Sequence, residues 1–281
     1  MNQTISKAFS QLVESLTPAY DAGEAESIAN ILFEDLLKIS RTIRLVDSEK
    51  SLSELELEQL ESATNRLLNY EPVQHIVGFA YFCEHLFKVT PDTLIPRPET
   101  EELVYLIANE NKGAFKILDI GTGTGCIPIS LKLKIKETEV SAWDISPEAL
   151  SVAKGNAENL SANVHFELMD ALNITSEEKF DIIVSNPPYI PYSDKASMHQ
   201  NVLDFEPGLA LFVEDNDPLL FYRKIAEFGI TNLNEKGRLY FEIHERFGQE
   251  TKEMLLQLGY LNVEILHDLN GKDRMVKANL N

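Results

Sequence analysis

The chain has 281 residues, of which 44% are apolar and 25% are charged, as in ordinary globular proteins. This length suits about two domains, each large enough to bury a core. Acidic residues outnumber basic ones by 45 to 25, so the net charge is −20. Proteins that grip duplex nucleic acid neutralise its phosphates with Lys and Arg. The charge therefore disfavours a nucleic-acid partner, and we expect no direct nucleic-acid substrate.

The sequence also gives expectations about location. It contains no apolar run of transmembrane length, and its first residues lack the apolar segment of a signal peptide. Two cysteines, Cys83 and Cys126, are too few for a disulfide framework. We therefore expect a cytoplasmic protein with no membrane partner.

Residues 1–75 are predicted to form an all-helical domain. Apolar residues recur at helical spacing in two successive segments, and Ser53 with Glu56 makes a capping-box signature at the start of a third helix. No catalytic cluster occurs here, so recognition or packing is the expected role. Residues 76–97 contain short aromatic and β-branched runs, which predict a β-hairpin linker.

Residues 98–281 are predicted to form an α/β domain. A helix opens at Pro98 with acidic residues in its first turn. Strands are predicted at 116–120, 139–143, 163–168, 180–185, 238–243, 260–266 and 274–279, and helices near 126–134, 147–159, 218–232 and 247–257. This alternation predicts a mostly parallel sheet covered by helices on both faces. Asn270-Gly271 predicts that the last two strands form an antiparallel hairpin.

A glycine-rich loop follows the first of these strands. After Asp119 and Ile120 come Gly121, Thr122, Gly123, Thr124 and Gly125. A dinucleotide fingerprint has two residues between its second and third glycines, whereas this loop has one, and a phosphate-binding P-loop would end in Gly-Lys-Ser/Thr. The spacing resembles the S-adenosyl-L-methionine loop of class I (Rossmann-like) methyltransferases. A tight turn without a ligand is the alternative.

Acidic residues at the next two strand ends extend this expected cofactor site. Asp144 is placed to accept hydrogen bonds from both ribose hydroxyls, as acids do at this position in nucleotide-binding folds. A helix cap before Pro147 is the alternative for Asp144, although Ser146 could fill that role. Asp170 and Ala171 follow the third strand, where such folds contact adenine.

Asn186, Pro187, Pro188 and Tyr189 form the most specific motif of the chain, at the end of a buried strand. The two prolines fix the backbone and have no N–H, so nearby carbonyls can face a cleft. The Asn186 side chain adds a carbonyl acceptor and Tyr189 adds a flat aromatic face. These groups can hold a planar NH2 group beside a methyl donor, so Asn186, Pro187 and Tyr189 are the predicted catalytic residues, and all four residues are expected to bind substrate.

This chemistry leaves the methyl acceptor open. A glutamine amide, an adenine and a guanine all carry NH2 on a planar carbon. A nucleic-acid amino methyltransferase acting on adenine or guanine is therefore the first alternative. A binding module without catalysis is the second.

Over nearly its whole length the chain resembles the HemK/PrmC family of protein-glutamine methyltransferases. The segments that carry the resemblance are 71–78, 94–101, 119–125, 186–189, 205–207 and 271–274. The resemblance implies a seven-stranded methyltransferase domain at 98–281, a hairpin linker at 76–97 and a helical domain at 1–75 that docks a peptide chain release factor. The substrate it implies is the glutamine of the factor's Gly-Gly-Gln motif.

The same resemblance assigns roles to individual residues. It implies that residues 121–125, Asp144 and Asn186 contact S-adenosyl-L-methionine, and that residues 186–189 hold the glutamine. Relatives often carry a bulky residue at position 171, where this chain has Ala171, so Leu172 is the expected substitute in adenine packing. Arg97 is expected near the methionine end of the donor.

A second acidic cluster comprises Glu242, His244 and Glu245 near the end of a predicted strand. Such residues can ligate metals, but these lack a clear partner set. We expect a surface or cleft-edge role for them and no metal.

Overall fold

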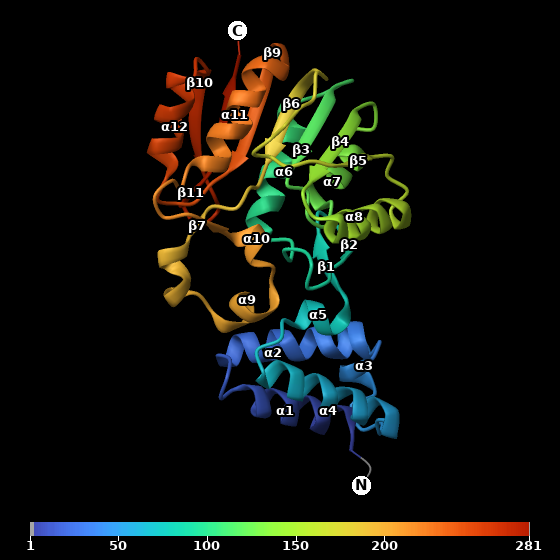
Figure 1. Ribbon diagram of the computed structural model, residues 1–281. Coiled ribbons are helices and arrows are strands. Elements are labelled where there is room, and N and C mark those ends of the chain that lie inside the picture. Colours follow the sequence, from blue (N-terminus) through green and yellow to red (C-terminus); the bar gives the residue numbers. More distant parts are fainter. Residues whose placement is uncertain (1–2, 281) are drawn as a thin grey trace. The chain divides into compact units, whose positions relative to one another are not determined.

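The computed structural model describes residues 3–280, which form two compact units (Figure 1). The first unit runs to Phe79 and also includes residues 199–205. The second unit comprises residues 80–198 and the chain from Glu206 onward. Within residues 3–280, no helix is both long and apolar enough to cross a membrane.

The first unit is helical, as predicted. Its elements are α1 (Ile5–Leu16), α2 (Ala22–Ile31), the π-helix η1 (Leu32–Leu36), α3 (Arg41–Val46), α4 (Glu54–Leu68), α5 (Val73–Val77) and α9 (Gln200–Phe205). The apolar helix faces meet in one core that includes Leu16 and Phe33. The predicted capping box is present, because the Ser53 N–H donates to Glu56 at 2.6 Å and the Glu56 N–H donates to the Ser53 hydroxyl at 3.3 Å.

A seven-stranded sheet forms the centre of the second unit. Its strands are β3 (Lys116–Ile120), β4 (Glu139–Asp144), β5 (His165–Leu168), β6 (Phe180–Ser185), β9 (Leu233–Glu242), β10 (Leu261–His267) and β11 (Asp273–Asn279). They lie in the order β10-β11-β9-β6-β3-β4-β5. β11 is antiparallel to both of its neighbours, β10 and β9. The other five strands, β9, β6, β3, β4 and β5, are parallel to one another. The predicted parallel sheet and terminal hairpin are confirmed.

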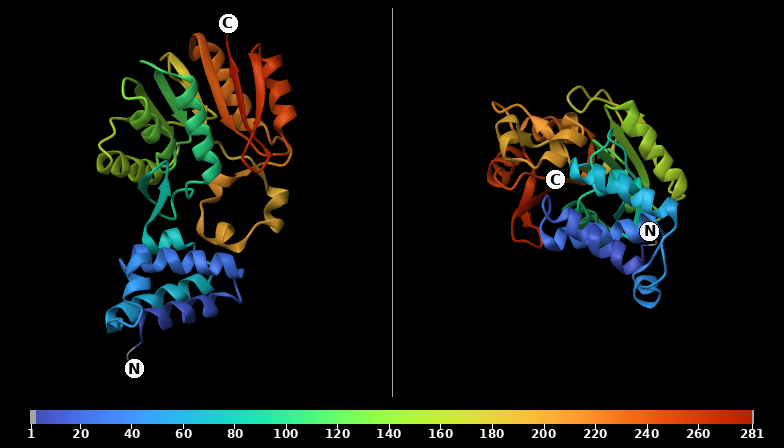
Figure 2. Two further views of the ribbon diagram at one scale, coloured as in Figure 1. Left: turned by 180° about the vertical axis from the view of Figure 1, so that it is seen from behind. Right: turned by 90° about the horizontal axis from the view of Figure 1, so that it is seen from below.

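Helices cover both faces of the sheet, which Figures 1 and 2 show from opposite sides. They are α6 (Pro98–Glu110), α7 (Cys126–Lys134), α8 (Pro147–Asn159), α11 (Leu220–Asn232) and α12 (Gly248–Gln257). One core packs α6 and α7 against Ile117 and Ile182, and the other packs α11 and α12 against Leu118 and Ile183. Successive strand residues point to opposite faces, so each central strand contributes to both cores.

Shorter elements lie in the connections of this unit. They are β1 (Phe79–Phe82), β2 (His85–Lys88), β7 (Ile190–Pro191), the 3-10 helix η2 (Tyr192–Ser197), α10 (Gly208–Leu211) and β8 (Phe212–Val213). β1 and β2 form the predicted hairpin, and β7 pairs with β8. The elements between β6 and α11 were not predicted, because segments this short leave no hydrophobic period in the sequence.

Candidate active site

The glycine loop leaves the C-terminal end of β3. Gly121, Gly123 and Gly125 have φ values of 79°, 54° and 79°, which L side chains rarely adopt. A Cβ added to Gly121 or Gly123 would meet nothing within 4 Å, whereas one added to Gly125 would lie 2.9 Å from Cδ1 of Ile129. Gly121 and Gly123 therefore border open space, and Gly125 allows close packing of the loop on α7.

Asp119 lies fully buried beneath this loop. Burial raises the pKa of its carboxyl to about 7; the Thr122 hydroxyl opposes this shift and the charge of Asp144 adds to it. A buried carboxyl is costly to ionise. The titration of Asp119 therefore depends directly on how well the loop excludes water.

Asp144, at the end of β4, is tied to the loop. Its Oδ2 accepts the Gly123 N–H at 2.8 Å, and its Oδ1 accepts the Ser146 N–H at 2.9 Å. The cap of α8 is Ser146, whose hydroxyl accepts the Ala149 N–H at 3.1 Å. Burial raises the pKa of Asp144, and the backbone N–H groups oppose that shift. The helix-capping alternative therefore does not account for Asp144, whose carboxylate keeps further acceptor positions.

A cavity of about 250 Å³ lies where the strands end. Parallel sheets bind ligands at this edge. The predicted site residues that line it are Gly121, Gly123, Asp144, Asp170, Ala171, Asn186, Pro187 and Pro188. The other predicted site residues within residues 3–280 do not line the cavity; they are Thr122, Thr124, Gly125 and Tyr189. Met169 and Leu172 add apolar wall beside Ala171. The cavity therefore joins the donor loop to the first three residues of the acceptor motif.

Asn186 lies next to the glycine loop because of strand register. Ser185 of β6 pairs with Ile120 of β3, so Asn186 and Gly121 leave adjacent strands that are about 4.8 Å apart. The Asn186 amide nitrogen donates to Oγ1 of Thr100 at 3.3 Å. Within residues 3–280 no hydrogen bond to Oδ1 of Asn186 is formed, so this acceptor is available to a ligand.

Tyr189, three residues after Asn186, is held in place by its own hydroxyl. The phenol donates to Oε1 of Glu242 at 3.2 Å, and the ring lies edge-on to His244 with centroids 5.9 Å apart. Burial, together with the charge of Glu242, raises the pKa of Tyr189 far above its usual value. Tyr189 therefore serves as a neutral hydrogen-bond donor in this arrangement.

The expected surface or cleft-edge role is wrong for Glu242. Glu242 is 1% exposed, and its two carboxylate oxygens accept hydrogen bonds from Tyr189 and from Thr100. Glu245 instead pairs with Lys272 at 2.7 Å. Within the described part of the chain, no group of three His, Cys, Asp or Glu residues could hold a metal ion. The sequence pattern was misleading because Glu242 is the inward-facing end of β9.

Arg97 contacts a buried acid. Its guanidinium lies 2.5 Å from Oε1 of Glu206, whose side chain is 1% exposed. The Ile95 N–H donates to the other oxygen, Oε2, at 3.1 Å. The ion pair therefore anchors the proline-rich segment 94–98 on the segment that follows α9, and Arg97 itself is not among the cavity-lining residues.

Comparison with known proteins places this site in a family. Residues 7–78 match the PrmC N-terminal domain, and residues 100–204 match the methyltransferase small domain. The release factor glutamine methyltransferase of Bacteroides thetaiotaomicron is 44% identical over 95% of this chain and 96% of its own. The corresponding Flavobacterium psychrophilum protein is 42% identical over 96% of both chains. The chain belongs to the release factor glutamine methyltransferase family.

Solved structures share the fold of this family member. A methyltransferase from Pyrococcus furiosus superposes with a TM-score of 0.53 at 20% identity, covering 78% of this chain and 98% of that one. The 16S rRNA N2 G1207 methyltransferase of Thermus thermophilus, solved with AdoMet and guanosine, gives a TM-score of 0.51 at 14% identity, over 72% of this chain and 50% of that one. At such identities the likeness establishes the class I fold.

Sequence reasoning expected residues 205–207 to shape the wall beyond the 186–189 motif, but it identified no contact partner for Glu206 and assigned no role to Thr100; both residues support the site of this family member. Thr100 lies two residues after a proline in a helix's first turn, and Glu206 lies between an aromatic residue and a proline. Neither pattern distinguishes a buried polar contact from an exposed one. Only the positions of their partners, Glu242 and Arg97, reveal their roles.

Proposed function

We propose that this protein transfers a methyl group from S-adenosyl-L-methionine to the side-chain amide nitrogen of the glutamine in the Gly-Gly-Gln motif of peptide chain release factors. The observation that carries the proposal is the single cavity that contains both the open glycines of the donor loop and Asn186. The relatives that share almost the whole chain are release factor glutamine methyltransferases.

The residues of the cavity suit the donor. S-adenosyl-L-methionine, when bound, supplies an activated methyl group on a cationic sulfur. Gly121 and Gly123 leave room for it, because a side chain at either position would fill space that is open in the structure. Asp144 provides carboxylate acceptors for ribose hydroxyls. Ala171 and Leu172 offer an apolar surface for adenine.

The acceptor poses the harder chemical problem, because an amide nitrogen delocalises its lone pair. We propose that Oδ1 of Asn186 and the carbonyl of Pro187 each accept one hydrogen of the substrate NH2. Both hydrogens then point away from the donor and the lone pair points toward it. Placement and fixed dipoles would supply most of the acceleration, and no strong base is needed before transfer, since the nitrogen loses its proton more readily afterwards.

The assay uses labelled S-adenosyl-L-methionine with a release factor, the same factor with its motif Gln replaced by Ala, RNA and DNA. Label is expected in the intact factor alone. Label in RNA or DNA and not in the factor would reverse the assignment in favour of the nucleic-acid alternative. Binding of the donor without transfer to any acceptor would indicate a binding module.

Asn186→Ala tests the acceptor site within this assay. The variant is expected to abolish turnover while leaving the donor dissociation constant within a few fold, because the donor's other contacts remain. Near-normal turnover in this variant contradicts the proposed role of Asn186.

We further propose that the first unit docks the release factor. Support comes from its match to the PrmC N-terminal domain and from the exposure of Leu45 and Val46, at 74% and 77%. The double variant Leu45→Ser/Val46→Ser is expected to raise KM for the whole factor and not for a Gly-Gly-Gln peptide. An unchanged KM for the whole factor argues against docking through this pair.

A further inference from the structure

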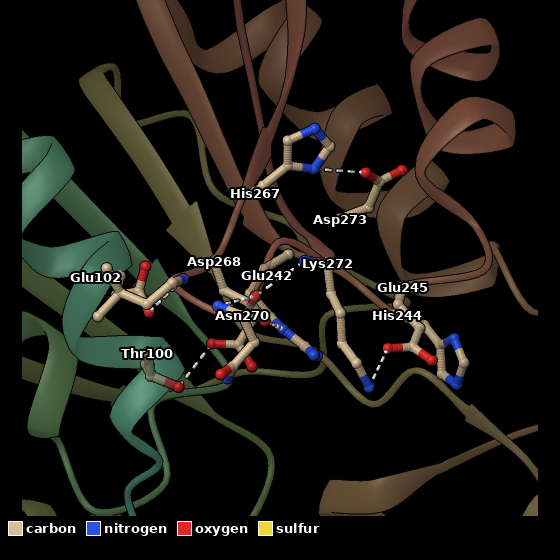
Figure 3. A network of polar contacts seen from close by, with 12 residues as sticks. Thr100, Glu102, Glu242, His244, Glu245, His267, Asp268, Asn270, Lys272 and Asp273 are labelled. Atoms are coloured by element: carbon tan, nitrogen blue, oxygen red, sulfur yellow. Dashed lines mark hydrogen bonds and ion pairs between the residues drawn. The ribbon is translucent and has the colours of Figure 1, made fainter.

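A chain of hydrogen bonds runs from the acceptor residue into the interior of the second unit. The Asn186 amide nitrogen donates to Oγ1 of Thr100 at 3.3 Å, and the Thr100 hydroxyl donates to Oε2 of Glu242 at 2.6 Å. Figure 3 shows Thr100, in the first turn of α6, pointing toward Glu242 at the end of β9. Thr100 and Glu242 are 3% and 1% exposed, so water does not compete freely for these contacts.

The direction of each hydrogen bond follows from the chemistry of these groups. An ionised carboxylate only accepts, so Glu242 requires the single hydroxyl proton of Thr100. The Thr100 oxygen then presents lone pairs to Asn186. Only the NH2 end of the Asn186 amide can bond to those lone pairs, because a flipped amide would set two acceptors against each other.

Both carboxylate oxygens of Glu242 face hydroxyl donors, Oε2 that of Thr100 and Oε1 that of Tyr189. Burial is the largest influence and raises the pKa of its carboxyl; the Thr100 hydroxyl, the charge of Arg274 and the Tyr189 hydroxyl oppose part of that shift. Arg274 is itself held at 3.2 Å by Asp268. The acid therefore has two hydroxyl donors and a nearby cation, which together stabilise its ionised form.

We propose that Thr100 and Glu242 are positioning residues, which hold the Asn186 side chain with its carbonyl oxygen turned toward the methyl acceptor. The inference rests on the proposed function, since it is this oxygen that would accept a hydrogen from the substrate NH2. Without Thr100 the amide can take either orientation. The wrong orientation presents NH2 to NH2, which offers no hydrogen bond to the substrate.

Thr100→Val is the sharpest test, because it keeps the shape of the side chain and removes its hydroxyl. We expect kcat to fall on the order of 10- to 100-fold, less than the roughly 100- to 1,000-fold cost of removing a preorganised donor that contacts the reacting atoms, because Thr100 acts through Asn186. The donor dissociation constant is expected to stay within about two-fold. Thr100→Ser restores the hydroxyl and is expected to recover most of the turnover, which a packing role for the threonine methyl would not allow.

Thr251→Val is the matched control. Thr251 is also a buried threonine in the second unit; it lies on α12 and is not among the residues that line the cavity. The same chemical change there is expected to leave kcat unchanged. Turnover of Thr100→Val within two-fold of wild type, or turnover of Thr100→Ser as low as that of Thr100→Val, overturns the proposal.

A second readout needs no methyl transfer. The side-chain amide signal of Asn186 in a ¹⁵N-labelled protein can be identified by its loss in Asn186→Ala. We expect this signal to shift in Thr100→Val and to stay in place in Thr251→Val. If wild-type protein fails to methylate release factors, the proposed function fails and this signal still decides the positioning role: an unmoved Asn186 signal in Thr100→Val refutes it.

Discussion

Replacing Asp119 by Asn is expected to change how the stability of the donor-free protein depends on pH. The pKa of Asp119 is raised by burial from 3.8 to about 7. Between these values the folded protein holds a proton that the unfolded chain has released. Raising the pH therefore destabilises the fold across this window, and the effect is complete by about pH 8, one unit above the folded-state pKa.

The structure sets the size of this effect. The pKa of Asp119 rises from 3.8 to about 7, and each pKa unit corresponds to about 1.36 kcal/mol. Across this window the wild-type protein therefore loses roughly 4 kcal/mol of its free energy of unfolding. Burial is complete, so solvent screening does not reduce this figure. Asn does not titrate, and any cost of burying its amide is the same at every pH. The stability of Asp119→Asn relative to wild type should thus increase by up to about 4 kcal/mol from pH 4 to pH 8.

Urea unfolding followed by circular dichroism at half-unit pH steps measures this difference. Acids that do not interact with Asp119 titrate alike in both proteins and cancel, so the informative quantity is the gap between the two curves. A gap that widens between pH 4 and pH 7 and is constant above pH 8 supports the reasoning. Two parallel curves across the whole range refute it, because Asp119 would then titrate alike in the folded and unfolded states.

Three further predictions test the loop and its surroundings. Gly125→Ala is expected to lower the free energy of unfolding, measured in urea, by about 1–3 kcal/mol. The added Cβ would lie 2.9 Å from Ile129, at a residue whose φ is 79°. The control Gly155→Ala has open space at its Cβ and should not destabilise the protein. Asp144→Asn is expected to weaken donor binding on the order of 10-fold by calorimetry, since a carboxylate accepts hydroxyl hydrogen bonds more strongly than an amide does; unchanged affinity would exclude ribose binding by Asp144. Burial raises the pKa of Cys126 to about 12, so a thiol reagent at pH 8 should label it only after unfolding, and rapid labelling of the native protein would contradict its burial.

Much of this architecture could be predicted because it depends on local sequence patterns. The alternating strands and helices predicted the sheet, and Asn270-Gly271 predicted the final hairpin, whose strands β10 and β11 are paired antiparallel. The glycine spacing predicted a loop whose glycines have positive φ. Each of these features depends on residues that are close in sequence.

The support of the acceptor site could not be predicted in this way. Thr100 lies 142 residues from Glu242 and 86 from Asn186. Their contacts depend on how α6 packs beside the ends of β6 and β9, which no local pattern specifies. Tyr189 shows the same limit, because its aromatic ring suggested stacking on a substrate while its hydroxyl is bound to Glu242.

Strand register explains why the proposed donor and acceptor sites share one cavity. Four paired residues of β9, β6, β3 and β4 form a continuous row across the sheet: Phe241, Ser185, Ile120 and Trp143. The residue after each is Glu242, Asn186, Gly121 and Asp144 in turn. Neighbouring residues in this second row come from adjacent strands, which are about 4.8 Å apart. A slip of one residue in β6 would turn Asn186 to the opposite face of the sheet. The well-packed cores on both faces of β6 thus hold Asn186 between its support and the donor loop.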